Sequence, residues 1–449
     1  MFHAPLELRA EDALTRAGLV GAFTYALDLT EGQPAGHSLR SCYIASRIAR
    51  QLGLEGDAFA SVYYATLLKD LGCSSNAARI HELYATDDVE LKRGYKTIPV
   101  GLPGTLRFVV SKTGAGAPLH RRVAAIAHIL RNGDAIAQEM IVTRCTRGAD
   151  IARELRFSDA VAGGIYRLDE HWDGSGRPEG LVGLDIPLPA RLALLAQVAD
   201  VFLQHGGPDA AAHEVAGRAG NWLDPALAAE FAVLAADPMF WADLASPAIE
   251  AITLALAPPE QCEVDESFLD AVTAAFGQVI DAKSPFTGGH SLRVADLAEE
   301  LGARFDMLPA RRRQLRRAAA LHDVGKLGVS SAILEKPGKL DDREWTIMRQ
   351  HAAHTRAILG RIGPLAELAG VAAAHHERLD GKGYPLGLDD RAIGRETRII
   401  TLCDFYDALT ADRPYRAAMP QDQALAIIGG EVGTAIDPDC FAALREMLA

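Results

Sequence analysis

The sequence predicts an all-α protein built from two tandem helical units, and three observations support this prediction. Apolar residues recur at the spacing of amphipathic helices, as in "SLRSCYIASRIARQLGL" and "SLRVADLAEELGARF". Stretches with the alternating pattern of β-strands are scarce. Motifs of the first half of the chain return in the second half, and 449 residues are enough for two domains.

The repeat can be followed by counting residues. "GHSLR" begins at 36 and again at 289, and "LKDLG" at 68 matches "LHDVG" at 321, both at an offset of 253. From residue 144 onward the offset is 207, which pairs "LDEHWDGSGRP" at 168–178 with "HHERLDGKGYP" at 375–385. The first copy therefore carries 46 additional residues between about 74 and 143. Two long units indicate a tandem duplication with divergence and not a solenoid.

Proline and glycine mark the ends of the predicted helices, as in "KPGKL", "RIGPL" and "GYPLGL". The 46-residue insertion contains "TLRFVVSK", the best strand candidate in the chain, so short strands are predicted there. A connector helix is expected over about 240–257, before a Pro-Pro break. We therefore expect a first domain at 1–257 and a second domain at 258–449.

Composition restricts the classes of function. A formal charge of −13 argues against a nucleic-acid polymer as partner, and the basic run "ARRRQLRR" is interpreted as a solvated helix face. The six cysteines are scattered without a CxxC pair, which is typical of reduced thiols in the cytosol. No signal peptide is recognisable, and no stretch approaches ~18 uninterrupted apolar residues. A cytoplasmic protein without a membrane span is expected.

Seven potential metal ligands of the second copy fall within 115 residues, each on or beside a separate helical segment. Imidazole nitrogen combined with carboxylate oxygen suits iron, manganese or zinc. One ion takes about three or four protein ligands, so seven ligands predict two ions with Asp323 as the bridge. A hydroxide held between the two ions would attack a phosphodiester. The seven residues are His290, His322, Asp323, His351, His375, His376 and Asp404.

Lys326 follows Asp323 by three residues, so a helix would place both side chains on one face. An ammonium group at that position could stabilise negative charge on the departing oxygen of a cleaved phosphodiester. Any one of these residues alone is more often structural than functional, but their ordered combination in one domain favours a phosphohydrolase.

The second copy resembles the HD-GYP family, a subgroup of the HD metal-dependent phosphohydrolases. The resemblance covers about 265–446 and rests on "GGHSLRVADLAEELG", "LHDVGKLGV", "ILEKPGKL", "HHERLDGKGYPLGL" and "DFYDALTADRPYR". It implies an HD-type helical domain with a bi- or trinuclear iron or manganese centre that hydrolyses a cyclic dinucleotide. Trinuclear members carry Glu four residues before the first histidine, where this chain has Phe286, so a binuclear centre is expected.

The resemblance also implies roles for individual residues. One ion would take His290, His322, Asp323 and Asp404, and the other would take Asp323, His351, His375 and His376. Lys326 and Asp323 match catalytic positions. Tyr384, Arg413 and Arg416 match positions that hold the phosphates or guanine of the substrate, a role that suits the bidentate guanidinium group.

The first copy keeps only two of the seven ligands, His37 and Asp70. The other five positions hold Lys69, Arg144, Leu168, Asp169 and Gln197. Lys69 and Arg144 would repel cations and pair with the neighbouring carboxylates instead. We therefore expect a degenerate HD-type domain without a complete metal site, which serves regulation or dimerisation. His171 aligns with Arg378 and is not expected to be a ligand.

These observations predict a metal-dependent phosphodiesterase, and the resemblance implies a cyclic dinucleotide as substrate. Cyclic di-GMP, hydrolysed to pGpG and in some members onward to GMP, is the first expectation. 3',3'-cyclic GMP-AMP or another nucleotide phosphate stays open as the substrate, because nothing in the sequence fixes which base is bound. A non-catalytic receptor or scaffold for a cyclic dinucleotide is the alternative from a different class. A homodimer and contacts with other cyclic di-GMP signalling proteins are compatible with both functions.

Overall fold

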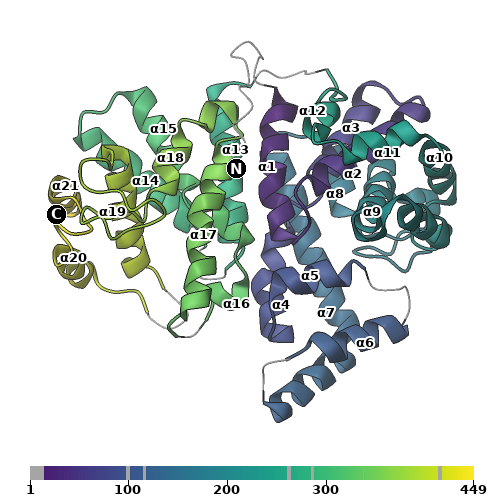
Figure 1. Ribbon diagram of the computed structural model, residues 1–449, viewed down its shortest axis with the longest axis horizontal. Coiled ribbons are helices and arrows are strands. Elements are labelled where there is room, and N and C mark those ends of the chain that lie inside the picture. Colours follow the sequence, from purple (N-terminus) through teal and green to yellow (C-terminus); the bar gives the residue numbers. More distant parts are fainter. Residues whose placement is uncertain are drawn as a thin grey trace.

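The computed structural model describes residues 15–97, 102–114, 118–259, 264–284, 288–336, 338–412 and 417–449. Within these ranges helices are the only regular elements, and the β-bridges are isolated. Two helical bodies lie side by side, with the first half of the chain on the right of Figure 1 and the second half on the left. The all-α prediction is confirmed. Among the described helices, none combines the length and apolar content needed to cross a membrane.

The first repeat contains twelve α-helices and two short 3₁₀ helices in its described residues. α9 bends at Gly207, which has a φ of 80° and is followed in the chain by Pro208. The elements are α1 (Arg16–Thr30), α2 (His37–Gln51), α3 (Gly56–Leu67), η1 (Cys73–Asn76), α4 (Ala77–Tyr84), α5 (Asp88–Tyr95), α6 (Leu102–Lys112), α7 (Leu119–Glu154), α8 (Asp159–Tyr166), η2 (Gly183–Asp185), α9 (Leu188–Arg218), α10 (Pro225–Ala235), α11 (Pro238–Ala245) and α12 (Ile249–Leu254).

The second repeat follows the same plan with fewer elements before its long central helix. α17 begins with a capping box, in which Asp341 and Glu344 each accept a backbone N–H of the other. The elements are α13 (Glu266–Asp281), α14 (His290–Arg304), α15 (Pro309–Ala320), η3 (Val324–Gly328), α16 (Ser331–Leu334), α17 (Asp342–Leu359), η4 (Gly363–Leu365), α18 (Leu368–Ala373), α19 (Arg395–Thr410), α20 (Gln421–Gly429) and α21 (Pro438–Leu448).

The two repeats pack against each other through equivalent elements. α1 packs against η3 and α17, and α13 packs against η1 and α7. Phe23 of α1 stacks on Phe276 of α13, with ring centroids 3.8 Å apart, and the two residues are related by the offset of 253. Because each contact has its counterpart, the duplication has produced an interface with internal two-fold symmetry.

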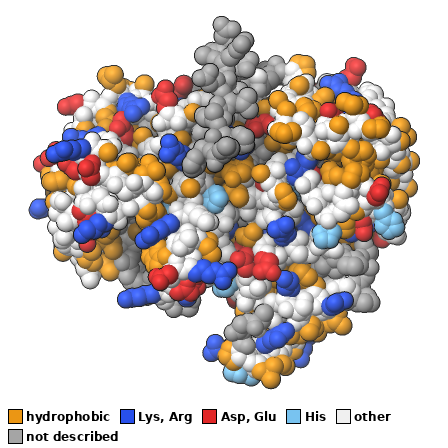
Figure 2. Space-filling model, in the orientation of Figure 1, with side chains coloured by type: hydrophobic (Ala, Val, Ile, Leu, Met, Phe, Trp, Pro, Cys, Tyr) orange, Lys and Arg blue, Asp and Glu red, His pale blue; other side chains and the backbone are white. Residues whose placement is uncertain are grey.

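The prediction of strands in the insertion is wrong. "TLRFVVSK" lies in α6, and α6 with the adjoining part of α7 projects from the first body (Figure 1). Val109 is buried against Ile129 and Ile136 of α7. Phe108 packs against the same group of residues, so packing on α7 outweighs the β-propensity of the valines. Figure 2 shows basic and apolar side chains together on this hairpin.

The expected connector helix at 240–257 is instead two short helices, α11 and α12. Ser246, which precedes Pro247, has an extended backbone, as residues before proline commonly do, and this ends α11. α12 packs against α1 and α2, and the Tyr63 hydroxyl donates to the Thr253 carbonyl. The segment is therefore packed onto the first body and does not run as one helix between the two.

Candidate metal centre

The seven predicted ligands of the second repeat meet in one cluster. The turn between α15 and η3 reaches α17 closely: a Cβ added to Gly325 would lie 1.9 Å from the carbonyl oxygen of His351. Only glycine fits this approach, which brings the ligands of the turn next to those of the helix. His290 begins α14, His322 and Asp323 lie in the turn before η3, His351 lies in α17, His375 and His376 follow α18, and Asp404 lies in α19.

Asp323 lies between two pairs of histidines. Its Oδ2 is 3.3 Å from Nε2 of His322 and 3.9 Å from Nε2 of His290. Its Oδ1 is 3.6 Å from Nε2 of both His351 and His375. Each carboxylate oxygen therefore faces one histidine pair, which is the arrangement of a carboxylate that bridges two ions.

Asp404 and His376 complete the two groups. Asp404 Oδ1 is 3.4 Å from Nε2 of His290 and 3.8 Å from Nε2 of His322. Ligand atoms of these three residues lie within 4.8 Å of one another, and the same holds for Asp323, His351, His375 and His376. By distance the seven residues thus form two groups, and Asp323 belongs to one group while its Oδ2 faces the histidines of the other.

Hydrogen bonds leave the inner nitrogens of three histidines free for a cation. Nδ1 of His322, His351 and His375 lies 2.6–2.7 Å from the carbonyl oxygen three residues earlier in each case. These contacts place the proton on Nδ1 and leave the Nε2 lone pair available. The three Nε2 atoms and Asp323 Oδ1 are buried without a hydrogen-bond partner. An unpaired buried polar atom costs about 1–3 kcal/mol, so the donor set fits divalent cations.

The electrostatics of the cluster also favour a cation. Burial lowers the pKa of His375 and His376 well below the usual range, and neighbouring histidines add to the effect, so both imidazoles are neutral ligands. Burial acts against ionised Asp323, but Lys326 and His322 hold its pKa well below the usual range. At His322 burial is outweighed by Asp323 and Asp404, which raise its pKa to about 9. The same carboxylates stabilise positive charge there, whether it is a proton or a metal ion.

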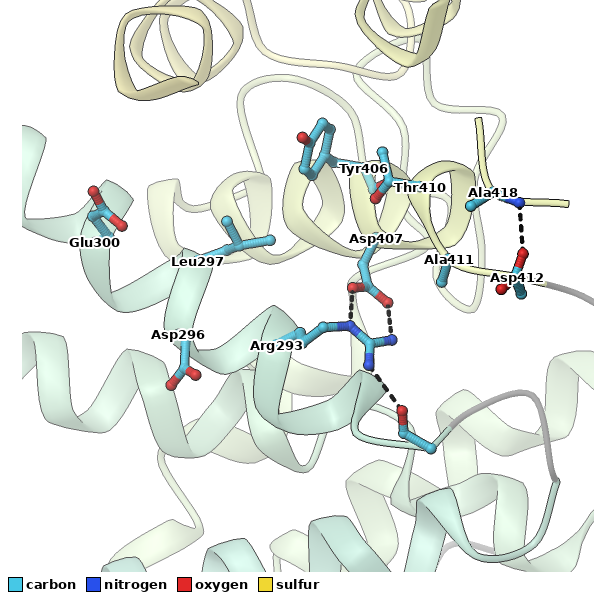
Figure 3. Close-up of a pocket in the computed structure, with 11 residues that line it drawn as sticks. Arg293, Asp296, Leu297, Glu300, Tyr406, Asp407, Thr410, Ala411, Asp412 and Ala418 are labelled. Atoms are coloured by element: carbon cyan, nitrogen blue, oxygen red, sulfur yellow. Dashed lines mark hydrogen bonds and ion pairs between the residues drawn. The ribbon is translucent and has the colours of Figure 1, made fainter. Parts of the chain in front are cut away.

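A carboxylate behind the cluster orients His290. Asp407 Oδ2 is 2.6 Å from Nδ1 of His290, and Arg293 donates to both oxygens of Asp407 at 2.6 and 3.0 Å (Figure 3). Asp407 is not among the residues predicted from the sequence, although it follows Asp404 by almost one helical turn. A carboxylate that holds the outer nitrogen of a ligating histidine is common in metal sites.

The cluster opens into a cavity of about 590 Å³. Lys326 lines it and forms an ion pair with Asp323. Tyr384 also lines it and packs on His376, with ring centroids 4.7 Å apart. The predicted substrate residues Arg413 and Arg416, and Phe286 of the binuclear prediction, lie outside the described residues.

In the first repeat, cationic side chains occupy positions that hold ligands in the second. Lys69 forms an ion pair with Asp70, and Arg144 forms one with Asp169, as the sequence predicts. The backbone approach is the same, because a Cβ on Gly72 would lie 1.9 Å from the Arg144 carbonyl oxygen. The first repeat therefore keeps the same backbone approach. At two ligand positions it carries the cationic side chains of Lys69 and Arg144, which balance the charge of Asp70 and Asp169.

Glu31, Asp70 and Cys73 also lie close enough together to hold an ion. Glu31 is already ion-paired with two ammonium groups: Lys96 Nζ is 2.7 Å and Lys92 Nζ is 3.5 Å from its oxygens. Burial raises the pKa of the Cys73 thiol well above its usual range, and the two carboxylates add to the shift. A protonated thiol is a poor ligand, so this group is a set of buried ion pairs. Glu31 and its two lysines are not among the residues predicted from the sequence.

Two histidines of the first repeat have defined partners. Nδ1 of His37 lies 2.6 Å from Asp200, the counterpart of the contact between His290 and Asp407. His171 stacks on Trp222 with ring centroids 4.3 Å apart and belongs to none of the potential metal groups in the described residues.

Known proteins resemble this chain over its whole length. A family model for the HD domain matches residues 125–227 and 275–440. The 3'3'-cGAMP-specific phosphodiesterase 3 of Vibrio cholerae is 50% identical over 98% of this chain and 96% of its own. A cyclic di-GMP phosphodiesterase of the same organism is 38% identical over 39% of this chain and 40% of its own. A crystal structure of a cyclic GMP-AMP specific phosphodiesterase from V. cholerae covers 96% of this chain and 97% of its own, with 45% identity and a TM-score of 0.66. The chain belongs to the HD-GYP family of HD-domain phosphodiesterases.

Proposed function

We propose that this protein hydrolyses 3',3'-cyclic GMP-AMP at the cluster of its second repeat. The observation that carries the hydrolytic function is the position of Asp323, whose two oxygens face two separate histidine pairs. The substrate is supported by the relative that is 50% identical over 98% of this chain and is named for 3'3'-cGAMP. Cyclic di-GMP, the first expectation from the sequence, becomes the second candidate, because the relative compared above that is named for it matches 39% of the chain.

The division of labour follows the two repeats. We assign catalysis to residues 258–449 and treat residues 1–257 as a degenerate domain without a metal site. The ion pairs of Lys69 and Arg144 support this assignment, because they fill ligand positions with positive charge.

The donor set suits two divalent ions, iron or manganese. When bound, such ions polarise a phosphoryl oxygen and lower the pKa of water at the site. One ion would be held by His290, His322, Asp323 and Asp404, and the other by Asp323, His351, His375 and His376.

Side chains around the cluster would position the substrate and its charge. Lys326 stands beside Asp323, where its ammonium can stabilise negative charge on the departing oxygen. Lys339 lines the same cavity and supplies positive charge for a substrate with two phosphates, and Lys336 lines it as an ion pair with Glu344. We assign Tyr384 to the substrate side of the cavity. Arg413 and Arg416 are assigned to phosphate or guanine on the family resemblance alone.

The test is turnover by the full-length protein, purified without oxygen and loaded with Fe²⁺ or Mn²⁺. We expect cleavage of 3',3'-cyclic GMP-AMP to a linear dinucleotide, with a higher kcat/KM than for cyclic di-GMP assayed in parallel. Elemental analysis should find two ions per chain. Faster turnover of cyclic di-GMP would reverse the choice of substrate. Bound metal without cleavage of any cyclic dinucleotide would contradict the hydrolase and favour a receptor.

A further inference from the structure

Trp345 presents an aromatic ring at the edge of the catalytic cavity. Its side chain is 43% exposed and lines the same cavity as His351, His376 and Tyr384. Aromatic rings carry a large apolar surface, and burying that surface is favourable. An indole left open beside the metal cluster is therefore available to a ligand that has a flat apolar face.

A guanidinium group connects this ring to the aromatic ring next to the metal ligands. The Arg349 guanidinium carbon lies 5.7 Å from the ring centroid of Trp345 and 5.4 Å from that of Tyr384. Tyr384 in turn packs on His376 at 4.7 Å. These distances are those of cation–π and ring contacts. The side chains therefore form a continuous series from the predicted metal ligand His376 to the edge of the cavity, in the order His376, Tyr384, Arg349 and Trp345.

The neighbouring lining has the chemistry of a nucleotide site. Leu340 offers an apolar surface and Lys339 offers positive charge, whereas the Lys336 ammonium is paired with Glu344. The carboxylates among the described lining residues are Asp281 and Asp323, and both contact residues at the metal cluster. The edge of the cavity near Trp345 is thus apolar and cationic, which suits a base attached to a phosphodiester.

The first repeat supports a link between this series and the chemistry. α7 is a single helix that runs through residues 138–144, so the offset of 207 extends back along it: Gln138 stands in place of Trp345 and Val142 in place of Arg349, and Arg177 stands in place of Tyr384. Gln138 donates a hydrogen bond to the carbonyl of Pro178, so it is committed to the loop that matches the GYP segment. The repeat without a metal centre has therefore lost the whole series.

We propose that Trp345 is the stacking platform for one purine base of the substrate, held in place by Arg349. The proposal rests on the proposed function, which puts one phosphodiester at the metal cluster. The two bases of a cyclic dinucleotide then extend from the cluster along the cavity walls, and one of them meets the indole. Base stacking on an aromatic side chain contributes substantially to nucleotide affinity and accepts any base, because every base has a π-face.

The test compares a substrate that has purine bases with a phosphodiester that has none. Trp345→Leu keeps apolar bulk and removes the π-face, whereas Trp345→Phe keeps a smaller one. With 3',3'-cyclic GMP-AMP, we expect Trp345→Leu to raise KM about tenfold or more, with kcat little changed, and Trp345→Phe to recover most of the loss. With bis(p-nitrophenyl) phosphate, which has no base, kcat/KM should be the same for both variants and the wild type. Tyr95→Leu, at an exposed ring of the first repeat, is the matched control and should change neither substrate.

The outcomes separate this proposal from the proposed function. An unchanged KM for the dinucleotide in Trp345→Leu overturns the platform, and so does an equal loss on both substrates, which indicates a structural role. Trp345 is the only tryptophan in residues 258–449, so the fluorescence that Trp345→Phe removes reports on this ring. If the wild type cleaves no cyclic dinucleotide but 3',3'-cyclic GMP-AMP quenches that fluorescence, the platform stands and the hydrolase fails. If there is neither cleavage nor quenching, both are overturned.

Discussion

Phe23 and Phe276 occupy the same place in the two repeats and stack on each other, with ring centroids 3.8 Å apart and planes inclined by 19°. Both rings are fully buried. The helices that carry them, α1 and α13, each pack against the turn of the other repeat that contains Asp323 or Asp70. The contact between the repeats therefore lies close to the turn that carries Asp323.

The stacked pair should be strongly coupled. We expect Phe23→Ala and Phe276→Ala each to lower the free energy of unfolding by about 3–5 kcal/mol, because each leaves a cavity in a shared core. The double variant should lose less than the sum of the two, by about 0.5–3 kcal/mol, since the second truncation removes a contact that is already lost. Chemical denaturation measures both effects. Phe276→Ala combined with Phe231→Ala, a buried change elsewhere in the first repeat, should be additive. Additivity of Phe23→Ala and Phe276→Ala would refute the shared packing.

Asp407 should control metal affinity through His290. Asp407→Asn keeps the shape of the side chain but weakens the acceptor of the Nδ1 proton, so we expect metal affinity to fall about 10- to 100-fold. Titration with a competing chelator measures this, and saturating metal should restore part of kcat. Asp200→Asn makes the same change at the equivalent contact of His37 and should leave metal affinity unchanged. Equal loss of metal in both variants would show that Asp407 acts only through the fold.

Lys326 should affect the rate and not the metal content. We expect Lys326→Ala to lower kcat for 3',3'-cyclic GMP-AMP by about 10²–10³-fold, the effect of removing one group that stabilises transition-state charge. Elemental analysis should still find the ions, because the seven ligands remain. Lys112→Ala is the control, since this ammonium pairs with Glu90 away from the catalytic cavity. An unchanged kcat in Lys326→Ala would remove the residue from the mechanism.

The free energy of unfolding should depend on pH through His37. Burial lowers the pKa of this imidazole from 6.5 to about 4, in spite of its contact with Asp200. As the pH falls from 6.5 to 4, the unfolded chain binds a proton here and the folded chain does not, so the free energy of unfolding decreases over that interval. The difference between wild type and His37→Gln should therefore change by about 3 kcal/mol across it, as measured by denaturation at several pH values. His120→Gln, at an exposed position, should show no such difference, and a constant difference for His37→Gln would contradict the assignment.

The sequence predicted the helices and the cluster for different reasons. Helical periodicity identified α2 and α14 directly, because one face of each is buried. The duplication and the family motifs identified His290 to Asp404, since spacing between segments carries information that single residues lack. The strand prediction at α6 failed because the valines favour a strand locally, whereas the helix is stabilised by packing on α7, which the local sequence does not show.

The partners of the site residues could not be predicted in the same way. Asp407 lies one turn from a ligand, but its contact with His290 depends on how α14 and α19 pack. Glu31 ends α1, whereas Lys92 and Lys96 lie one turn apart at the end of α5, and nothing in the local sequence brings these two segments together. Lys69 with Asp70 and Arg144 with Asp169 were predictable, because the second repeat supplies a template for where these positions meet.

The ion pairs in the first repeat have an evolutionary consequence. Changing Lys69 back to histidine removes the nearest counter-charge of the buried Asp70, and loss of one partner of such a pair costs about 3–5 kcal/mol. The change would bring no catalytic benefit until Arg144, Leu168, Asp169 and Gln197 had also reverted. Reversion of Lys69 alone thus lowers stability before any activity returns. A stepwise return to a metal centre would therefore have to pass through a less stable first repeat.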